Sequence, residues 1–151
     1  MPLPEDWRQF IESFNSHGVE YLVVGAVALA HHGLPRYTGD LDILVRNSPE
    51  NAQRVEAALA ELGFASLGLK ATDFVDSYRV IQLGFPPNRI DLLTSVTGVT
   101  FDQAWANRVE GVLGQTRMNF IGRDALILNK RMTGRAKDKA DLEALGWNEP
   151  S

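Results

Sequence analysis

The chain has 151 residues, of which 44% are hydrophobic and 23% charged, which predicts one globular domain spanning residues 1–151. A net charge of −4 argues against a surface built generally for nucleic acid, and the absence of cysteine excludes disulfides, thiolate nucleophiles and cysteine-ligated zinc. The apolar stretches are too short to cross a bilayer, and we see no signal peptide, so we expect a cytoplasmic protein with no membrane partner.

Helical and strand patterns alternate along the first half of the chain. Apolar residues at helical spacing predict a helix over 4–16, and β-branched residues predict a short strand over 21–24. An alanine-rich helix over 25–32 and a buried strand over 41–46 follow. Ser48 and Pro49 are typical of a helix start, and Gly63 ends that helix.

The second half of the chain predicts two strands, 78–85 and 89–94, which flank Pro86-Pro87-Asn88 at a hairpin-like spacing and are therefore expected to be antiparallel. A short helix over 100–107, strands over 109–114 and 117–121, and closing helices over 123–132 and 136–145 follow. The last two helices carry six basic and two acidic residues between Arg123 and Lys139, a local charge of +4 that would suit a triphosphate or an RNA end. We predict an α/β (α+β) domain with a mixed, partly antiparallel sheet flanked by helices.

Two carboxylates open the strand over 41–46. Asp40 and Asp42 stand two residues apart, so their side chains point to the same face of the strand. Like charges on one face are costly to keep ionised without a counter-charge, and hard oxygen ligands favour Mg²⁺ or Mn²⁺. Asp91, on a strand that can lie beside this one, supplies a third carboxylate as metal ligand and candidate base for an acceptor hydroxyl.

Phosphate binding is predicted at the start of the helix over 25–32. Backbone N–H groups at a helix N-terminus attract anions, and Gly25, followed by Ala26, allows the backbone to approach a ligand closely. Arg36 and Thr38 lie just before the carboxylates, where they would orient a phosphate or the metal-binding loop.

From the closing helices, Lys130, Arg135 and Lys137 would reach the triphosphate or the acceptor. A solvated basic face, or ion pairs with Asp138 and Asp141, is the alternative for these three residues. For Asp91 the alternative is a structural ion pair with Arg89 or Arg79.

The motifs in combination resemble the nucleotidyltransferase fold of the DNA polymerase β superfamily, and most closely its compact bacterial members related to minimal nucleotidyltransferases and abortive-infection toxins. The resemblance spans roughly residues 20–145 and is carried by Val24-Gly25-Ala26, by the run from Arg36 to Val45, by Ile90-Asp91-Leu92 and by the run from Leu126 to Leu142. It implies Mg²⁺-dependent transfer of a nucleoside monophosphate from an NTP, with ATP expected, to a hydroxyl of RNA, a protein or a small molecule. It also implies a possible helical partner of the HEPN type.

The chain departs from the family pattern at Ala26, where serine or glycine is usual. Alanine keeps the backbone donors but lacks a hydroxyl, a loss of about 0.5–1.5 kcal/mol for one neutral hydrogen bond. A second interpretation is therefore a weakly or non-catalytic nucleotide-binding antitoxin, or partner-binding module, of a toxin–antitoxin pair. Transfer onto a cationic small molecule such as an aminoglycoside is a third.

Overall fold

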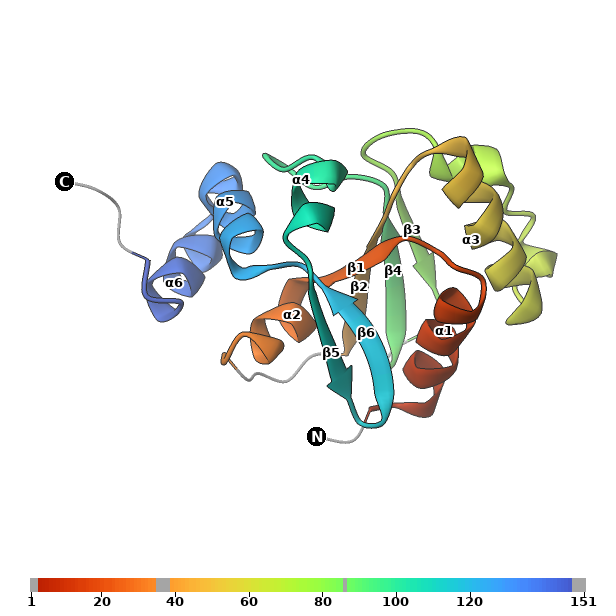
Figure 1. Ribbon diagram of the computed structural model, residues 1–151, viewed down its shortest axis with the longest axis horizontal. Coiled ribbons are helices and arrows are strands. Elements are labelled where there is room, and N and C mark those ends of the chain that lie inside the picture. The colour runs from red at the N-terminus through yellow and green to blue at the C-terminus, as the bar shows by residue number, and fades with distance from the viewer. Residues whose placement is uncertain (1–2, 35–38, 86, 148–151) are drawn as a thin grey trace.

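The computed structural model describes residues 3–34, 39–85 and 87–147. Within these ranges six strands form one sheet in the order β3-β4-β2-β1-β6-β5 (Figure 1). Their bounds are β1 (Tyr21–Val24), β2 (Asp40–Val45), β3 (Val80–Leu83), β4 (Arg89–Leu93), β5 (Val109–Leu113) and β6 (Thr116–Phe120). The pairs β1–β2, β3–β4 and β5–β6 are antiparallel, whereas β2–β4 and β1–β6 are parallel. The predicted mixed, partly antiparallel sheet is confirmed.

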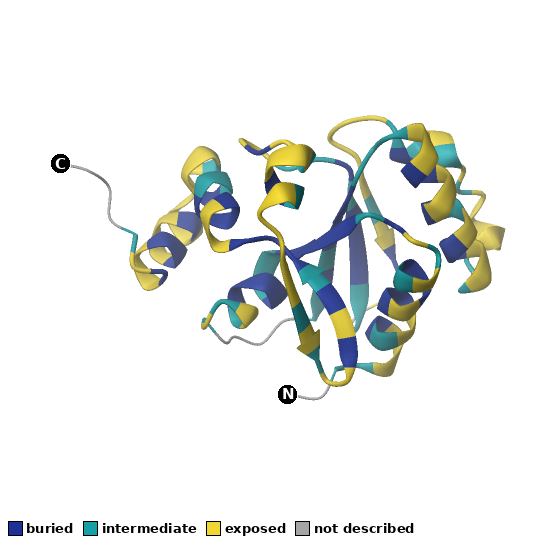
Figure 2. Cartoon of the chain, in the orientation of Figure 1, coloured by how far each residue is buried: buried dark blue, intermediate teal, exposed yellow. Residues whose placement is uncertain are grey.

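Helices flank the sheet, with α1 and α3 on one side and α2, α5 and α6 on the other (Figure 1). The α-helices are α1 (Glu5–Ser16), α2 (Gly25–His31), α3 (Pro49–Glu61), α4 (Phe101–Ala106), α5 (Arg123–Thr133) and α6 (Ala136–Ala144). The central strands β1 and β2 carry buried side chains over most of their length, and the inward faces of the helices complete the core (Figure 2). None of the described helices is both long and apolar enough to cross a membrane.

The predicted elements are confirmed with small shifts in their bounds. The predicted strand over 78–85 is shorter, because Tyr78 has φ +62° and Gly84 has φ +72°, and neither angle continues an extended strand. The sequence analysis assigned no element to the two short 3₁₀ helices at Ala65–Leu67 and Ala71–Phe74. Arg36 and Thr38 lie outside the described residues.

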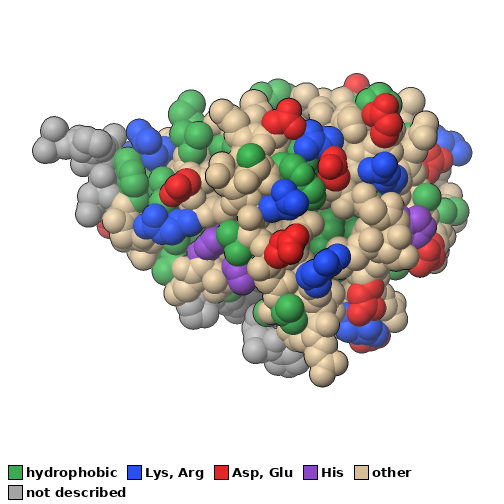
Figure 3. Space-filling model, viewed as in Figure 1, with side chains coloured by type: hydrophobic (Ala, Val, Ile, Leu, Met, Phe, Trp, Pro, Cys, Tyr) green, Lys and Arg blue, Asp and Glu red, His purple; other side chains and the backbone are tan. Residues whose placement is uncertain are grey.

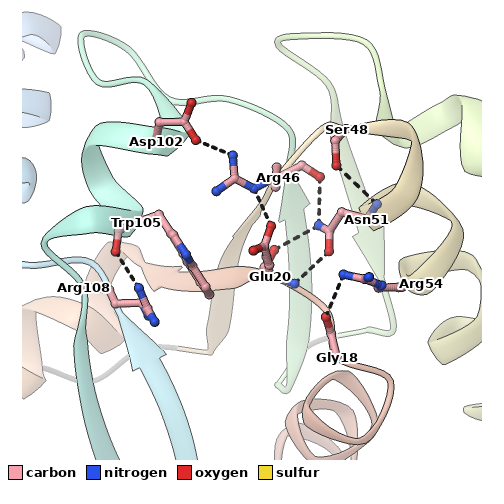
Figure 4. Close-up of polar contacts among 9 residues, drawn as sticks. All are labelled: Gly18, Glu20, Arg46, Ser48, Asn51, Arg54, Asp102, Trp105 and Arg108. Carbon is pink, nitrogen blue, oxygen red and sulfur yellow. Dashed lines mark hydrogen bonds and ion pairs between the residues drawn. The ribbon is translucent and has the colours of Figure 1, made fainter.

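Polar side chains fasten α3 and α4 to the ends of the central strands (Figure 4). Buried Asn51 accepts a hydrogen bond from the Glu20 amide at 2.8 Å and donates to the Arg46 carbonyl at 2.9 Å. The Arg46 guanidinium forms ion pairs with Glu20 and Asp102 and lies 4.5 Å above the Phe101 ring. These contacts hold α4 against the sheet just beyond the C-terminal end of β2, which is the end opposite to Asp40 and Asp42.

Candidate functional site

The three predicted carboxylates lie on one face of the two strands at the centre of the site, β2 and β4. Asp42 is directly opposite Val24 of β1 on one side and Asp91 of β4 on the other. Gln82 of β3 is opposite Asp91, so a single row of side chains crosses four strands at this level. Asp40 stands one pleat away, opposite Arg89. Parallel pairing of β2 with β4 thus brings Asp91 beside a pair of carboxylates that lies far earlier in the sequence.

Arg89 forms a cationic bridge between two of these carboxylates. Its Nη2 lies 3.2 Å from Asp40 Oδ2 and 3.2 Å from Asp91 Oδ2, and its Nε lies 3.2 Å from Asp91 Oδ1. The Nε and Oδ1 atoms are buried, and their alignment makes no hydrogen bond, so this last contact is purely electrostatic. The alternative stated for Asp91, an ion pair with Arg89, is therefore observed, and Asp91 also lies beside Asp42.

Asp42 is the electrostatically strained member of the group. Burial raises the pKa of its carboxyl from the ordinary 3.8 to about 6, and the neighbouring charges of Asp91 and Asp40 add to the effect, while Arg89 opposes it. Within this group three carboxylates stand around the single guanidinium of Arg89.

Gly25 leaves the room that Asp42 occupies. It has φ +69°, and a Cβ built on its backbone would overlap Asp42 Oδ2 and lie 3.1 Å from Asp42 Cγ. The turn from β1 into α2 therefore requires glycine twice over, for its backbone angle and for the carboxylate packed against it. Ala26 follows as the second residue of α2 and is partly exposed.

A cleft of about 320 Å³ opens between α2 and the two closing helices, above the carboxylates. Asp40 and Asp42 line it together with Gly25 and Ala26, and Lys130, Arg135 and Lys137 line the side formed by α5 and α6. The apolar part of its lining consists of Val24, Leu29, Leu93, Val96 and Leu126. Asp40 and Asp42 thus stand across one partly apolar cleft from three basic side chains, which are accompanied there by Asp138. On the face that Figure 3 shows, acidic and basic side chains are intermixed.

Lys130 reaches the cleft from a buried position in which its charge is paired. Its Nζ lies 2.9 Å from Asp141 Oδ2 and 3.5 Å from Asp138 Oδ1, so it joins α5 to α6. Burial alone would raise the pKa of Asp138, but hydrogen bonds from Arg135 and Thr133 outweigh it and hold that pKa well below its usual range. The ion-pair alternative for Lys130 is observed, whereas Lys137 is exposed at the cleft.

The donor chemistry suits a hard divalent cation, although the side chains do not enclose one as they stand. In the described part of the chain, no three His, Cys, Asp or Glu side chains are grouped as a metal site. The carboxylate oxygens are nevertheless of the type that Mg²⁺ and Mn²⁺ prefer, and buried Asp91 Oδ1 makes no hydrogen bond. Burial, and then the charges of Asp91 and Asp40, raise the pKa of Asp42, and a bound cation would offset the repulsion among these carboxylates, so the residues fit such an ion.

Comparison with known proteins identifies the fold. No protein-family model matches the chain, and no curated protein sequence matches it significantly. Six solved chains do match, among them the crystal structure of a candidate nucleotidyltransferase from Thermotoga maritima. That structure is 14% identical, with a TM-score of 0.59, and the match covers 95% of this chain and 94% of the other. The chain therefore has the nucleotidyltransferase fold, a mixed sheet flanked by helices.

Of the predicted site residues, the structure brings Asp40, Asp42, Gly25, Ala26, Lys130 and Lys137 to one cleft, with Asp91 beside Asp42. The sequence analysis did not include Arg89 among the site residues, although it stands two residues before Asp91 on the same strand face, and that spacing was the available signal. Leu29, Val96 and Asn129 also line the cleft. No sequence pattern singled them out, because their place depends on how α2 and α5 pack around the sheet.

Proposed function

We propose that this protein is a metal-dependent nucleotidyltransferase that moves a nucleoside monophosphate from an NTP to a hydroxyl acceptor. The observation that carries the proposal is that Asp40 and Asp42 line a cleft with basic residues on its opposite side, and that Asp91 lies directly beside Asp42. Phosphoryl chemistry of this kind depends on positioning and on charge neutralisation, and this cleft offers both signs of charge around one volume.

In the proposed reaction the acceptor oxygen attacks the α-phosphorus of the NTP, and the bond from that phosphorus to the bridging oxygen breaks, so pyrophosphate leaves. Asp91 accepts the proton of the acceptor hydroxyl. Asp40, Asp42 and Asp91 would hold Mg²⁺ or Mn²⁺, which supplies charge neutralisation on the phosphates when bound. Lys137, exposed at the cleft, and the backbone at Gly25 and Ala26 bind the triphosphate.

The test is thermal unfolding with ATP and the other NTPs, each with and without Mg²⁺. A ligand at a hundred times its Kd stabilises the folded state by about 2.7 kcal/mol. We expect the wild type to shift only when NTP and metal are both present, and the Asp40→Asn/Asp42→Asn double variant not to shift from its own baseline. An equal shift in the double variant would refute the assignment of the site.

A second function, nucleotide binding without efficient transfer in a partner-binding module, is favoured by two observations. Ala26 supplies no hydroxyl to a phosphate, and the Lys130 ammonium is engaged by Asp138 and Asp141. Under this alternative, the thermal shift persists but pyrophosphate is not released from ATP when RNA, protein or small-molecule acceptors are added. Co-purification with a helical HEPN-type partner would support it further.

A further inference from the structure

A second cavity, of about 320 Å³, lies on another side of the pair formed by α5 and α6. These two helices pack against each other at one end of the molecule (Figure 1). Leu126 and Asn129 of α5 line the cleft above the carboxylates (the carboxylate cleft), whereas Leu128 and Arg131 line the second cavity. At about 3.6 residues per turn, these two pairs of side chains point to different sides of the helix. None of the three site carboxylates is among the described residues that line the second cavity.

Two exposed cations, Arg131 and Lys139, stand at this cavity with no acidic partner among the residues that the structure describes. The ion pairs described around α5 and α6 are made by Lys130 and Arg135 instead. Glu143 is the acidic side chain in the described lining, so positive charge is in excess there. A guanidinium binds phosphate through two parallel hydrogen bonds, and an ammonium binds it as a point charge. The rim of the cavity therefore favours an anionic ligand.

The rest of the lining is apolar and includes an aromatic ring. Leu142 is buried, and Leu128 and Trp147 are partly buried. The Arg131 guanidinium lies 4.7 Å from the centre of the Trp147 ring, in a cation–π contact. Nucleobases stack on aromatic rings and on guanidinium planes, and such stacking is worth about 1–3 kcal/mol per base. Arg131 and Trp147 together thus offer a stacking surface next to the two cations.

A nucleoside monophosphate matches every part of this lining. Its phosphate carries about two negative charges at pH 7, which Arg131 and Lys139 would share. Its base would stack on Arg131 and Trp147, and its ribose hydroxyls or base amine would donate hydrogen bonds to Glu143. Inorganic phosphate would leave the apolar surface unused, an apolar carboxylate would give Glu143 no donor, and a triphosphate would bring further negative charge next to Glu143. The volume lies at the lower end of the range for small-molecule sites, roughly 300–1,000 Å³.

We propose that the cavity formed by α5, α6 and Trp147 is a second binding site, which takes a nucleoside monophosphate. The inference goes beyond the proposed function, because it requires neither a metal ion nor a transfer step. Arg131 and Lys139 bind the phosphate, Trp147 and the Arg131 guanidinium hold the base, and Glu143 accepts hydrogen bonds from the ligand. The nucleotide is held there as a ligand and not as a substrate, since the three carboxylates of the candidate site lie outside this cavity.

The probe is AMP, titrated by calorimetry in the presence of a chelator, with adenosine, inorganic phosphate and metal-free ATP as comparison ligands. Arg131→Gln/Lys139→Gln removes the two cations of the cavity. Its matched control is Arg108→Gln/Lys137→Gln. Arg108 is exposed and lies 3.9 Å from the centre of another tryptophan ring, and Lys137 is an exposed lysine of α6 that lines the carboxylate cleft. The control therefore also detects AMP that binds in the carboxylate cleft.

We expect the wild type and the control to bind one AMP per chain with equal affinity, and Arg131→Gln/Lys139→Gln to bind it at least about tenfold more weakly, a loss of about 1.4 kcal/mol. Adenosine, phosphate and metal-free ATP should each bind the wild type more weakly than AMP does. The thermal shift of Arg131→Gln/Lys139→Gln with ATP and Mg²⁺ should equal that of the wild type, because its two substitutions lie outside the carboxylate cleft.

The inference would be overturned by equal AMP binding in the two double variants, by loss of AMP binding in the control, or by no binding to the wild type. Phosphate or metal-free ATP that binds as tightly as AMP would also overturn it, as would a helical peptide rich in leucine and glutamate that binds this cavity when AMP does not. Loss of AMP binding in Arg131→Gln/Lys139→Gln alone, in a protein that ATP and Mg²⁺ do not stabilise, would support the second site while refuting the proposed function.

Discussion

Replacing Asp42 by asparagine should stabilise the protein at pH 8 when no divalent cation is present. The pKa of Asp42 is raised from 3.8 to about 6, chiefly by burial and then by Asp91 and Asp40. One pKa unit is worth about 1.4 kcal/mol, so the raised pKa means that the ionised carboxylate destabilises the folded state by about 3 kcal/mol. Asparagine has nearly the same shape and carries no charge, and its amide can still donate a hydrogen bond to Asp91.

The sign of the pH dependence follows from the direction of the shift. Because the folded-state pKa of Asp42 lies above the unfolded one, the folded protein holds more protons between pH 4 and 6, and the free energy of unfolding falls as pH rises through that window. Below about pH 4 the carboxyl is protonated in both states, and wild type and Asp42→Asn should have the same stability. Above about pH 6 the variant should gain the full difference, which corresponds to a melting-temperature increase of roughly 6–12 °C.

The measurement is chemical or thermal unfolding of both proteins from pH 4 to pH 8 in the presence of a chelator. Asp6→Asn, on the exposed surface of α1, is the control and should change stability by less than about 1 kcal/mol across the range. A variant that is less stable than the wild type at pH 8, or a difference that does not change with pH, would contradict the electrostatic account of the site.

Three further substitutions test other parts of the structure. Gly25→Ala should cost about 1–3 kcal/mol of stability and abolish the thermal shift with ATP and Mg²⁺, because the new Cβ would displace the Asp42 carboxylate. Gly18→Ala is the control, since Gly18 also has a positive φ but open space around a Cβ, and it should keep the thermal shift. Arg89→Met removes the guanidinium that bridges Asp40 and Asp91, so it should lower stability above pH 6. Added Mg²⁺ should raise the melting temperature of this variant more than that of the wild type, and an equal increase in the two proteins would contradict the account. Lys130→Met should cost about 3–5 kcal/mol in denaturant unfolding, because it removes the buried ammonium that pairs with the buried carboxylates of Asp138 and Asp141. Exposed Lys139→Met should stay within about 0.5 kcal/mol.

Local periodicity accounts for much of what could be foreseen. The spacing of apolar residues, the serine and proline at the start of α3, and the glycine that follows α3 act on neighbours a few residues away. The elements are therefore found close to their predicted bounds. The shared face of Asp40 and Asp42 follows from the two-residue repeat of any strand. The start of β3 was predicted too early because the residue type of Tyr78 gives no sign of its positive φ.

Gly25 has a structural role that its sequence motif did not indicate. As a residue without a Cβ, it was expected to let a phosphate approach the backbone. In the folded protein the atoms nearest to its missing Cβ belong to Asp42, so the same glycine also positions a carboxylate. Lys130 is a second case, since its partners Asp138 and Asp141 were recognised as alternatives in the sequence, but only the packing of α6 against α5 decides that they are used.

The sequence by itself determined the order of helices and strands, the pair of carboxylates on β2 and the glycine at the start of α2, because each depends on residues adjacent in the chain. Only the tertiary structure decided that β4 lies parallel to β2 with Asp91 opposite Asp42, that Arg89 bridges Asp40 and Asp91, and that β3 is left at the edge beside them. The physical reason is that strand order and register are settled by packing between segments far apart in sequence, which no local pattern of residues encodes.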